Sequence, residues 1–454
     1  SRERNTPMLK LTRSRYRWTE MWLLILPSLF MLIGLLALEI VDLNNKGGQP
    51  VTIDQKTLFQ PTAFVAAFGL IAALYGAHLA LCFIAPDADQ TLLPLAGTLS
   101  AIGVLMALRL GPDLGQNSLG AKQLVFVIVG LVLCVVTVWG TRSLRWIRDF
   151  KYTWAVLGIV LVGVTLVNAR RYAADAPNRD VLSLGSGGLS FQPSELLKIC
   201  LVIFFAGYLA ENREILAEGY RIGPLTLPPI KQLGPLLAML GVALLIFLGV
   251  HELGLAILIF GLFLAMIYAA SGRMFYVVGG LAAFALGAFV IYTFVGYAQQ
   301  RVAIVATAFD PNVEPNQGYQ LVRGLIAFGT GGFFGTGLGL GQPTLVPAAT
   351  TDYIAAAFAE EFGFAGLLAL IGVFMLLVYR GMHVAASGRD NFNKLMAIGL
   401  TSVFALQTVV ILAGDLKLMP LTGVPLPFVA YGGSSLVANY IIIGLMLRLS
   451  RTDV

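Results

Sequence analysis

The amino-acid sequence predicts an all-α protein that crosses a membrane many times, and two observations support this prediction. Of the 454 residues, 57% are hydrophobic and only 12% are charged, which is about half the charged fraction of an ordinary soluble domain. Apolar stretches of about 20 residues, the length that a helix needs to cross a bilayer, recur from Met21 to Leu449. These stretches are continuous rather than alternating, so a polytopic helical bundle is favoured over a β-barrel.

The first apolar run, Met21 to Ile40, follows a basic tail over residues 1–20. The run is long for a signal peptide and lacks a cleavage site of small residues, so we interpret it as a retained first span. All three cysteines lie within apolar runs, and the three histidines are scattered along the chain. Neither a disulfide framework nor a metal centre held by histidines is therefore expected.

We expect about 12 transmembrane helices in a single domain, residues 21–454, with both termini in the cytoplasm. This orientation places most of the 30 lysines and arginines on the inner side, as the positive-inside rule requires. The N-terminal spans occupy residues 21–190, and the region that carries motifs occupies residues 191–454. The spans begin near Met21, Pro61, Leu92, Lys122, Tyr152, Glu195, Leu233, Leu253, Met274, Tyr353, Leu395 and Pro427.

Four segments on the expected outer side are longer than simple connectors, and long irregular loops are usually functional or disordered. The largest, residues 296–352, has eight glycines between Gly324 and Gly341. Such a run serves either as a flexible loop or as a cradle for a phosphate or a sugar. A nucleotide P-loop is excluded because its lysine-containing motif is absent. The other three segments are residues 41–60, 168–194 and 415–427.

Asp352 is the sharpest candidate for chemistry, because it lies where the largest outer segment enters a span. Two interpretations are open: an aspartate at this position commonly caps a helix, and it can also act in catalysis. Glu360 and Glu361 follow about two helical turns deeper, where at least one should face other helices or water rather than lipid. Pairing with a basic residue is the simplest role for these glutamates.

Glu195 and Lys198 lie three residues apart at the outer end of another span, so they share one helical face and can neutralise each other. At such depth a functional pair and a structural ion pair are equally open. Arg301 and Arg323 flank the acidic run of residues 310–314, and they could pair with its acids or with anionic phosphates.

The run from Gly423 to Ser435, which closes the last outer segment and enters the final span, contains several prolines and glycines. Its composition predicts broken or re-entrant backbone, which is tolerated at membrane depth where it is buried or lines a polar cavity. A packing role and a role in a substrate groove are both open for Ser434 and Ser435.

Taken together, these segments resemble the RodA/FtsW (SEDS) family of shape, elongation, division and sporulation proteins. The resemblance covers the chain from about Gln192 to its end, and the earlier part matches mainly in hydropathy. The chain looks like the longer RodA-like subgroup, which has two extra N-terminal spans. Five motifs occur in the family's order: Phe191 to Lys198, Asp310-Pro311 with Gly318-Tyr319-Gln320, Gly331 to Gly341, Thr351-Asp352-Tyr353 with Glu360-Glu361, and Pro425 to Ser435.

The resemblance implies a glycosyltransferase of the bacterial cytoplasmic membrane that polymerises lipid II, a disaccharide-pentapeptide on a polyprenyl pyrophosphate, with its active site facing outward. A class B penicillin-binding protein and membrane lipids are the implied partners, and no nucleic acid is expected. The family's catalytic aspartate corresponds to Asp352, which would act as general base on the acceptor sugar hydroxyl. The residues expected to bind substrate are Glu195, Lys198, Arg301, Gln320, Glu360, Ser434 and Ser435.

The leaving pyrophosphate needs positive charge rather than a proton. Arg301, Lys198 or a divalent cation such as Mg²⁺ or Mn²⁺ could supply this charge. No tightly bound cofactor is expected.

The chain departs from the family pattern at three places. Many relatives have an Arg-Trp pair shortly before Gln192, where this chain has Asp180 to Gly185. A turn that is often Asp-Leu-Gly begins with Glu252 here, and the asparagine often seen near Asp415 is missing. None of these differences changes Asp352.

Two rival functions differ in class from an enzyme. A transporter that flips the lipid-linked precursor is compatible with twelve spans, although transporters usually bind their substrate near the bilayer midplane between internal repeats, and no convincing repeat is found. A non-catalytic scaffold that recruits the transpeptidase would use Glu195 and the loops as a docking surface, and it would tolerate any residue at position 352.

Overall fold

The computed structural model describes residues 16–46, 61–169, 182–184, 189–218, 220–222, 225–227, 230–310 and 315–451. Several sequence predictions lie wholly or largely outside these residues. They concern most of the basic tail 1–20, the distal part of the segment 41–60, most of the departure at Asp180 to Gly185, and the run from Pro311 to Glu314.

The described chain is a bundle of long helices with two small hairpins, so the all-α prediction is confirmed. Strands β1 (Leu182–Leu184) and β2 (Leu189–Phe191) form one antiparallel pair, and β3 (Tyr220–Ile222) and β4 (Leu225–Leu227) form the other. The helices are α1 (Trp18–Leu23), α2 (Ile25–Lys46), α3 (Pro61–Ile84), α4 (Leu92–Asp113), α5 (Leu119–Gly140), α6 (Arg145–Asp149), α7 (Lys151–Ala169), α8 (Pro193–Glu218), α9 (Ile230–Val250), α10 (Leu253–Ser271), α11 (Met274–Phe294), α12 (Gly296–Thr307), α13 (Pro315–Gly331), η1 (Pro343–Leu345, a 3₁₀ turn), α14 (Ile354–Ser387), α15 (Asn391–Asp415) and α16 (Gly433–Leu449).

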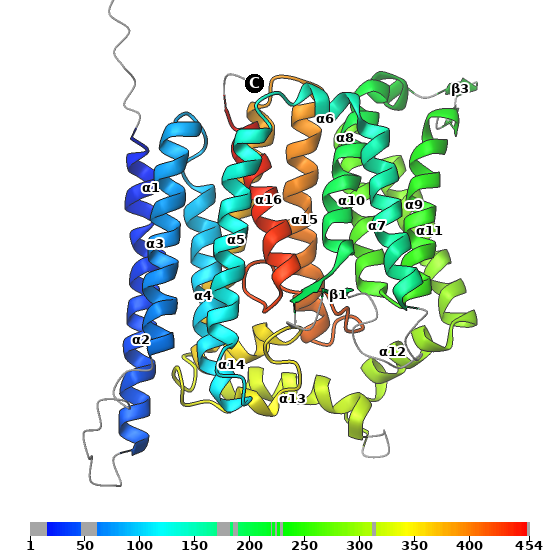
Figure 1. Ribbon diagram of the computed structural model, residues 1–454. Helices are drawn as coiled ribbons and strands as arrows, with labels where there is room; N and C mark the ends of the chain where they lie inside the picture. The colour runs from blue at the N-terminus through cyan, green and yellow to red at the C-terminus, as the bar shows by residue number, and fades with distance from the viewer. Residues whose placement is uncertain are drawn as a thin grey trace, which may run out of the picture.

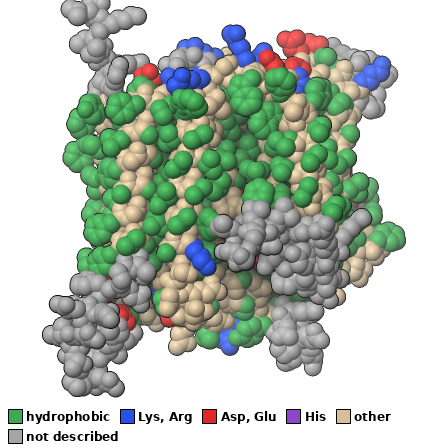
Figure 2. All heavy atoms as spheres, viewed as in Figure 1, with side chains coloured by type: hydrophobic (Ala, Val, Ile, Leu, Met, Phe, Trp, Pro, Cys, Tyr) green, Lys and Arg blue, Asp and Glu red, His purple; other side chains and the backbone are tan. Residues whose placement is uncertain are grey.

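The helices fit a membrane by length and by composition. Within the described residues, 10 candidate spans are long and apolar enough to cross a bilayer. Two shorter apolar helices, Lys151–Val167 and Gly433–Leu449, occupy the positions of the fifth and the twelfth predicted spans. Figure 2 shows hydrophobic side chains covering the flank of the bundle, with charged side chains gathered towards its two ends. This distribution is the one expected of a protein surrounded by lipid.

The bundle has two unlike ends (Figure 1). Helix α1 begins and α16 ends at the same end, which we call the terminal face. Helices α12 and α13 lie across the opposite end, which we call the loop face. The shared end of α1 and α16 agrees with the prediction that both termini lie on one side of the membrane.

Helices α4 and α8 form the interior, and α11 lies at the periphery. In the most apolar window of α4 and of α8, 89% of the residues are buried, whereas none are buried in that of α11. Gly103 on α4 permits the close approach of another segment, because a Cβ atom there would lie 2.6 Å from the carbonyl oxygen of Val429. The segment between α15 and α16 is thereby packed against the bundle interior.

The segment between α15 and α16, residues 416–432, forms no helix, and its residues 426–430 are all buried. Phe428 has a φ of 64°, and its ring lies 5.2 Å from that of Tyr440. Gln123 and Gln407 donate side-chain hydrogen bonds to carbonyl oxygens of this segment, at 3.2 Å and 2.6 Å. Broken backbone was predicted here, and these two side chains satisfy two of its carbonyl groups in the way that membrane burial requires.

Candidate active site

The glycine run between α13 and α14 packs against a break in α14. Gly363 interrupts that helix with φ 69° and ψ −173°. The freed amides of Phe364 and Ala365 donate to the carbonyl oxygens of Gly332 and Phe333, at 2.9 Å and 3.0 Å. A Cβ atom at Gly335 would lie 2.1 Å from the carbonyl oxygen of Glu361. These glycines therefore permit close contact between two backbones, as a glycine-rich run allows.

Asp352 lies in a tight turn directly before α14. The amides of Thr351 and Tyr353 both donate to the carbonyl oxygen of Ala348, at 3.0 Å and 3.2 Å, and Ala348 itself has a φ of 55°. The N-cap position of α14 belongs to Tyr353. Asp352 is therefore placed one residue before the cap and is partly exposed, and its catalytic role stays a prediction.

A cavity of about 170 Å³ brings three of the predicted site residues together. Asp352 comes from the turn before α14, Arg301 from α12 and Gln320 from α13. Their sequence separation shows that the fold assembles this cavity from three elements of the loop face. The remaining lining residues are Ile304, Val305, Leu321, Tyr353, Leu421 and Gly423.

Arg301 is held in place from two sides. Its Nη1 atom donates to the carbonyl oxygen of Leu421 at 2.6 Å, and its guanidinium lies 5.0 Å from the ring centroid of Tyr297. Burial raises the pKa of the Tyr297 phenol, against the opposing effect of the Arg301 charge, so this phenol stays neutral at physiological pH. Arg301 is thereby left as a fixed positive charge in the cavity that contains Asp352.

An apolar cavity of about 250 Å³ adjoins the first and shares Arg301 with it. Its walls come from α9, α10, α11 and α12, and Arg301 is its one charged lining residue. An apolar chain in this groove would therefore place a polar group attached to it beside Arg301. Representative lining residues are Leu244, Leu248, Phe260, Ala288, Ile291 and Pro420.

Sequence reasoning missed Asp415 as a site residue and noted only its neighbourhood as a departure. Asp415 ends α15, has no exposed surface, and neither carboxylate oxygen has a hydrogen-bond partner in the described part of the chain. Burial, with the charges of Asp415 and Asp352, raises the pKa of the Tyr353 phenol, so both carboxylates act on this buried ring. An acidic residue at a span end was the available signal, since ionisable residues at that depth are by default functional.

Glu195 and Lys198 form a buried ion pair away from the cavity of Asp352. Lys198 Nζ lies 2.7 Å from Glu195 Oε2, and both side chains are fully buried. The angles are not those of a hydrogen bond, so neither Glu195 oxygen has a donor among the described residues. Lys198 instead donates to Gln407 Oε1 at 2.9 Å. The ion pair predicted from the sequence is present, and whether its role is structural or functional stays open.

Glu361 and Glu360 hold the glycine run and do not line the cavity of Asp352. Arg109 Nε donates to Glu361 Oε1 at 2.8 Å, and Arg109 Nη2 donates to the carbonyl oxygen of Gly341 at 3.1 Å. Glu360 Oε1 accepts a hydrogen bond of 2.9 Å from the amide of Gln342. The expected pairing with a basic residue is found for Glu361. Glu360 lines a separate cavity of about 280 Å³ that also contains Arg323.

Ser434 and Ser435 take part in packing at the start of α16. Ser434 Oγ accepts a hydrogen bond of 2.9 Å from the amide of Gln192, and Ser435 Oγ lies 3.4 Å from Asn439 Nδ2, which donates to it. The hydrogen bond between Gln192 and Ser434 connects the first and the last of the five family motifs. A substrate-binding role for the two serines stays a prediction, because neither lines the cavity of Asp352.

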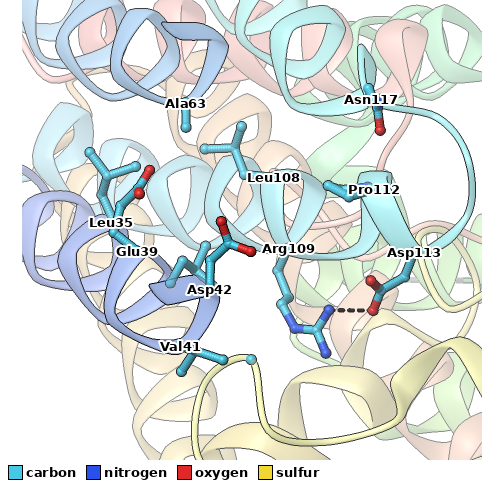
Figure 3. Close-up of a pocket in the computed structure, with 12 residues that line it drawn as sticks. Leu35, Glu39, Val41, Asp42, Ala63, Leu108, Arg109, Pro112, Asp113 and Asn117 are labelled. Atoms are coloured by element: carbon cyan, nitrogen blue, oxygen red, sulfur yellow. Dashed lines mark hydrogen bonds and ion pairs between the residues drawn. The ribbon is translucent and has the colours of Figure 1, made fainter. Parts of the chain in front are cut away.

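A further cavity on the loop face, of about 300 Å³, lies between α2, α3 and α4 (Figure 3). Glu39 and Asp42 project towards it from α2, and Arg109 turns towards Asp113 on α4. Asp352 does not line this cavity. The acidic residues of this cavity do not form a metal centre. Among the described residues, no group of three or more His, Cys, Asp or Glu side chains could hold a metal ion.

The sequence is similar to a known family and to named relatives. Residues 90–453 match the family model FtsW/RodA/SpoVE, described as cell cycle protein, so α1 to α3 precede the matched segment. The chain is 36% identical over 423 residues to the peptidoglycan glycosyltransferase RodA of Mycobacterium bovis, covering 91% of this chain and 87% of that protein. It is 30% identical to the probable peptidoglycan glycosyltransferase FtsW of Trichlorobacter lovleyi, covering 80% and 93% respectively.

Solved structures share the fold. A chain from a structure described as "Structural coordination of polymerization and crosslinking by a peptidoglycan synthase complex" has a TM-score of 0.63 at 25% identity, covering 80% of this chain and 97% of that one. The rod shape determining protein RodA of Thermus thermophilus has a TM-score of 0.55 at 24% identity, covering 80% and 96%.

Proposed function

This chain belongs to the FtsW/RodA/SpoVE family of cell cycle proteins, and on that premise we propose that it is a peptidoglycan glycosyltransferase that polymerises lipid II with Asp352 as general base. The observation that carries this proposal is the cavity in which Asp352 and Arg301 meet. One residue is a carboxylate that can take a proton, and the other is a fixed cation that can stabilise an anionic leaving group.

The two linked cavities match the two halves of a lipid-linked sugar. The apolar groove would receive part of the polyprenyl chain, and Arg301 at its end would contact the pyrophosphate. The sugar attached to that pyrophosphate would then lie beside Asp352 and Gln320. Asp352 would accept the proton of the acceptor hydroxyl as its oxygen attacks the anomeric carbon, and the pyrophosphate would leave as an anion.

A divalent cation would supply further positive charge to the leaving pyrophosphate if it were bound beside it. Mg²⁺ is usually held by one or two carboxylates together with substrate phosphates, and Asp352 is the one carboxylate among the residues that line the cavity. Asp415 is fully buried and does not line that cavity, although its charge acts on the same phenol as that of Asp352.

The chain is an integral membrane protein. We propose that it lies in the bacterial cytoplasmic membrane with the loop face outside, where lipid II is polymerised, and that a class B penicillin-binding protein is its partner. The relative from a peptidoglycan synthase complex supports the partner assignment. The arginine-rich terminal face supports the orientation, because basic residues gather on the cytoplasmic side.

An assay in detergent separates the enzyme from the transporter and scaffold alternatives, since no membrane is present for transport. Purified protein would be given labelled lipid II and the glycan products separated by length, for the wild type, Asp352→Ala and the control Asp113→Asn. Asp113 is an exposed acid at the end of α4 that does not line the cavity. Polymer from wild type and control but not from Asp352→Ala supports the proposal, whereas polymer from none, with the partner present, contradicts it.

A further inference from the structure

A basic pocket lies at the terminal face, at the opposite end of the bundle from Asp352. It has a volume of about 360 Å³ and is enclosed by three parts of the fold. One wall is the turn from α5 into α6, another is the end of α16, and the third is the start of α15. The lining residues are Arg142, Ser143, Leu144, Arg145, Arg148, Asp390, Phe392, Asn393 and Arg448.

Among the described residues, the arginines that line this pocket outnumber its carboxylates. Four arginines line it together with a single acid, Asp390. Asp390 already accepts a hydrogen bond of 2.7 Å from the amide of Asn393 as the N-cap of α15, and it lies 4.0 Å from Arg148. In the described part of the chain, the guanidiniums of Arg142 and Arg145 form no ion pair with a carboxylate. Arg148 also lies 3.8 Å from Asp149. Arg142 and Arg145 are like charges that repel each other, so a bound anion would stabilise the arrangement.

The pocket is built on a fixed frame rather than on mobile side chains alone. Arg448 has 4% of its surface exposed, and its Nε atom donates to the carbonyl oxygen of Thr141 at 2.9 Å. Its Nη2 atom also donates to the carbonyl oxygen of Arg142. The end of α16 therefore fixes the turn that carries Arg142. General positive-inside bias would place arginines on this face, but it would not require them to line one recess from two of its three walls.

Aromatic side chains place the recess at the level of lipid headgroups. Trp139 and Trp146 are 55% and 42% exposed, and tryptophans of membrane proteins gather where the bilayer meets water. The guanidinium of Arg142 lies 5.4 Å from the ring centroid of Trp139. Arg142 is thus presented at the depth at which the phosphates of the adjacent leaflet lie.

We propose that this pocket binds a phosphate-bearing anion through Arg142 and Arg145, with Arg148 and Arg448 completing the positive field. An anionic phospholipid headgroup and a soluble phosphate share this chemistry. The site does not depend on the polymerase assignment, because none of its residues lies near Asp352, and its test does not require turnover.

The test compares the purified wild type with Arg142→Gln/Arg145→Gln. A matched control, Lys231→Gln/Arg273→Gln, removes two positive charges from elsewhere on the chain. Each protein in neutral detergent is titrated separately with short-chain phosphatidylglycerol, short-chain phosphatidylcholine and inorganic phosphate. Binding is read from the rise in the thermal unfolding temperature, and bound lipids are counted by native mass spectrometry.

We expect wild type and control to bind phosphatidylglycerol in preference to phosphatidylcholine, and the arginine variant to bind it about 30-fold more weakly, as removal of two surface arginines implies. The same loss for inorganic phosphate alone would assign the site to a soluble phosphate. Equal losses in both double variants, or no selective binding by the wild type, would overturn the proposal. Unchanged unfolding temperatures in phosphatidylcholine establish that the variants are folded. If the double variant does not fold, the single variant Arg145→Gln replaces it in the titrations.

Discussion

The backbone amide of Tyr431 donates a hydrogen bond of 2.7 Å to the carbonyl oxygen of Thr350. Thr350 lies two residues before Asp352, and Tyr431 belongs to the segment of residues 416–432 between α15 and α16. The same segment accepts the hydrogen bond from Arg301 at Leu421. The segment between α15 and α16 therefore contacts both the turn that carries Asp352, the proposed base, and α12, which carries Arg301, the proposed cation. Both contacts are made by uncharged backbone groups of the segment, and they fix the distance between Asp352 and Arg301.

Replacement of Arg301 should slow polymerisation more than replacement of another arginine of the same face. We expect Arg301→Gln to lower kcat by roughly 10²–10³-fold, the range seen when a group that stabilises a developing anion is removed. Arg301→Lys should recover part of the rate, because it restores the charge but not the fork geometry. Arg323→Gln is the control, since Arg323 lines a different cavity. Equal losses for the two Gln variants in a lipid II assay would refute the assigned role.

Gly363 should be intolerant of any side chain. Its φ of 69° is unfavourable for other residues, and an added Cβ atom would lie 2.2 Å from the amide nitrogen of Gly335. We expect Gly363→Ala to lower the free energy of unfolding by about 3 kcal/mol or more. Gly372→Ala, later in the same helix and with open space around the added atom, should be neutral. Thermal unfolding of both variants in detergent measures the difference, and similar melting temperatures would contradict it.

The Glu195–Lys198 pair offers a test of structure against function. Lys198→Met leaves a fully buried carboxylate without its cation, which should cost about 3–5 kcal/mol of stability. Adding Glu195→Gln removes that charge and should restore most of the unfolding temperature. A purely structural pair predicts that polymerase activity returns with stability in the double variant. Stable but inactive protein would instead show that the charges themselves contact substrate.

Asp89 should make stability depend on pH at the terminal face. Burial alone would raise the pKa of this carboxyl, but hydrogen bonds from Thr91 and the charge of Arg380 outweigh it and hold the pKa below its usual range. Because the folded-state pKa is lowered, the stabilisation is present at neutral pH and disappears as the pH falls through that lowered value. The unfolding temperature of Asp89→Asn should therefore lie below that of the wild type at pH 7, and the two should converge in acid. A gap that is unchanged at pH 3 would contradict this account.

Hydropathy was sufficient to predict the fold class and the positions of the spans, because the cost of placing polar residues in lipid acts locally along the chain. Which residues lie together in the cavities depends on contacts between distant parts of the chain, and the spacing of residues along the sequence does not predict these contacts. Arg109 reaches Glu361 across 252 positions, and Arg301 joins Asp352 only because α12 and the turn before α14 line one cavity.

Two further features were beyond sequence reasoning. The break at Gly363 was not predicted, because the glycine run that fills it is remote in sequence and its composition suits a loop equally well. Asp415 was not selected as a site residue, because its significance lies in burial without a hydrogen-bond donor among the described residues. Both depend on three-dimensional packing rather than on local pattern.

The most direct test of the central claim is the initial rate of glycan polymerisation at saturating lipid II for Asp352→Asn against the wild type. Both proteins would be purified in complex with the transpeptidase partner, so that folding and assembly are matched. Removal of a general base that leaves the cavity shape intact should slow the reaction by about 10²–10⁴-fold, with little change in KM. A rate for Asp352→Asn equal to that of the wild type would show that Asp352 is not the base.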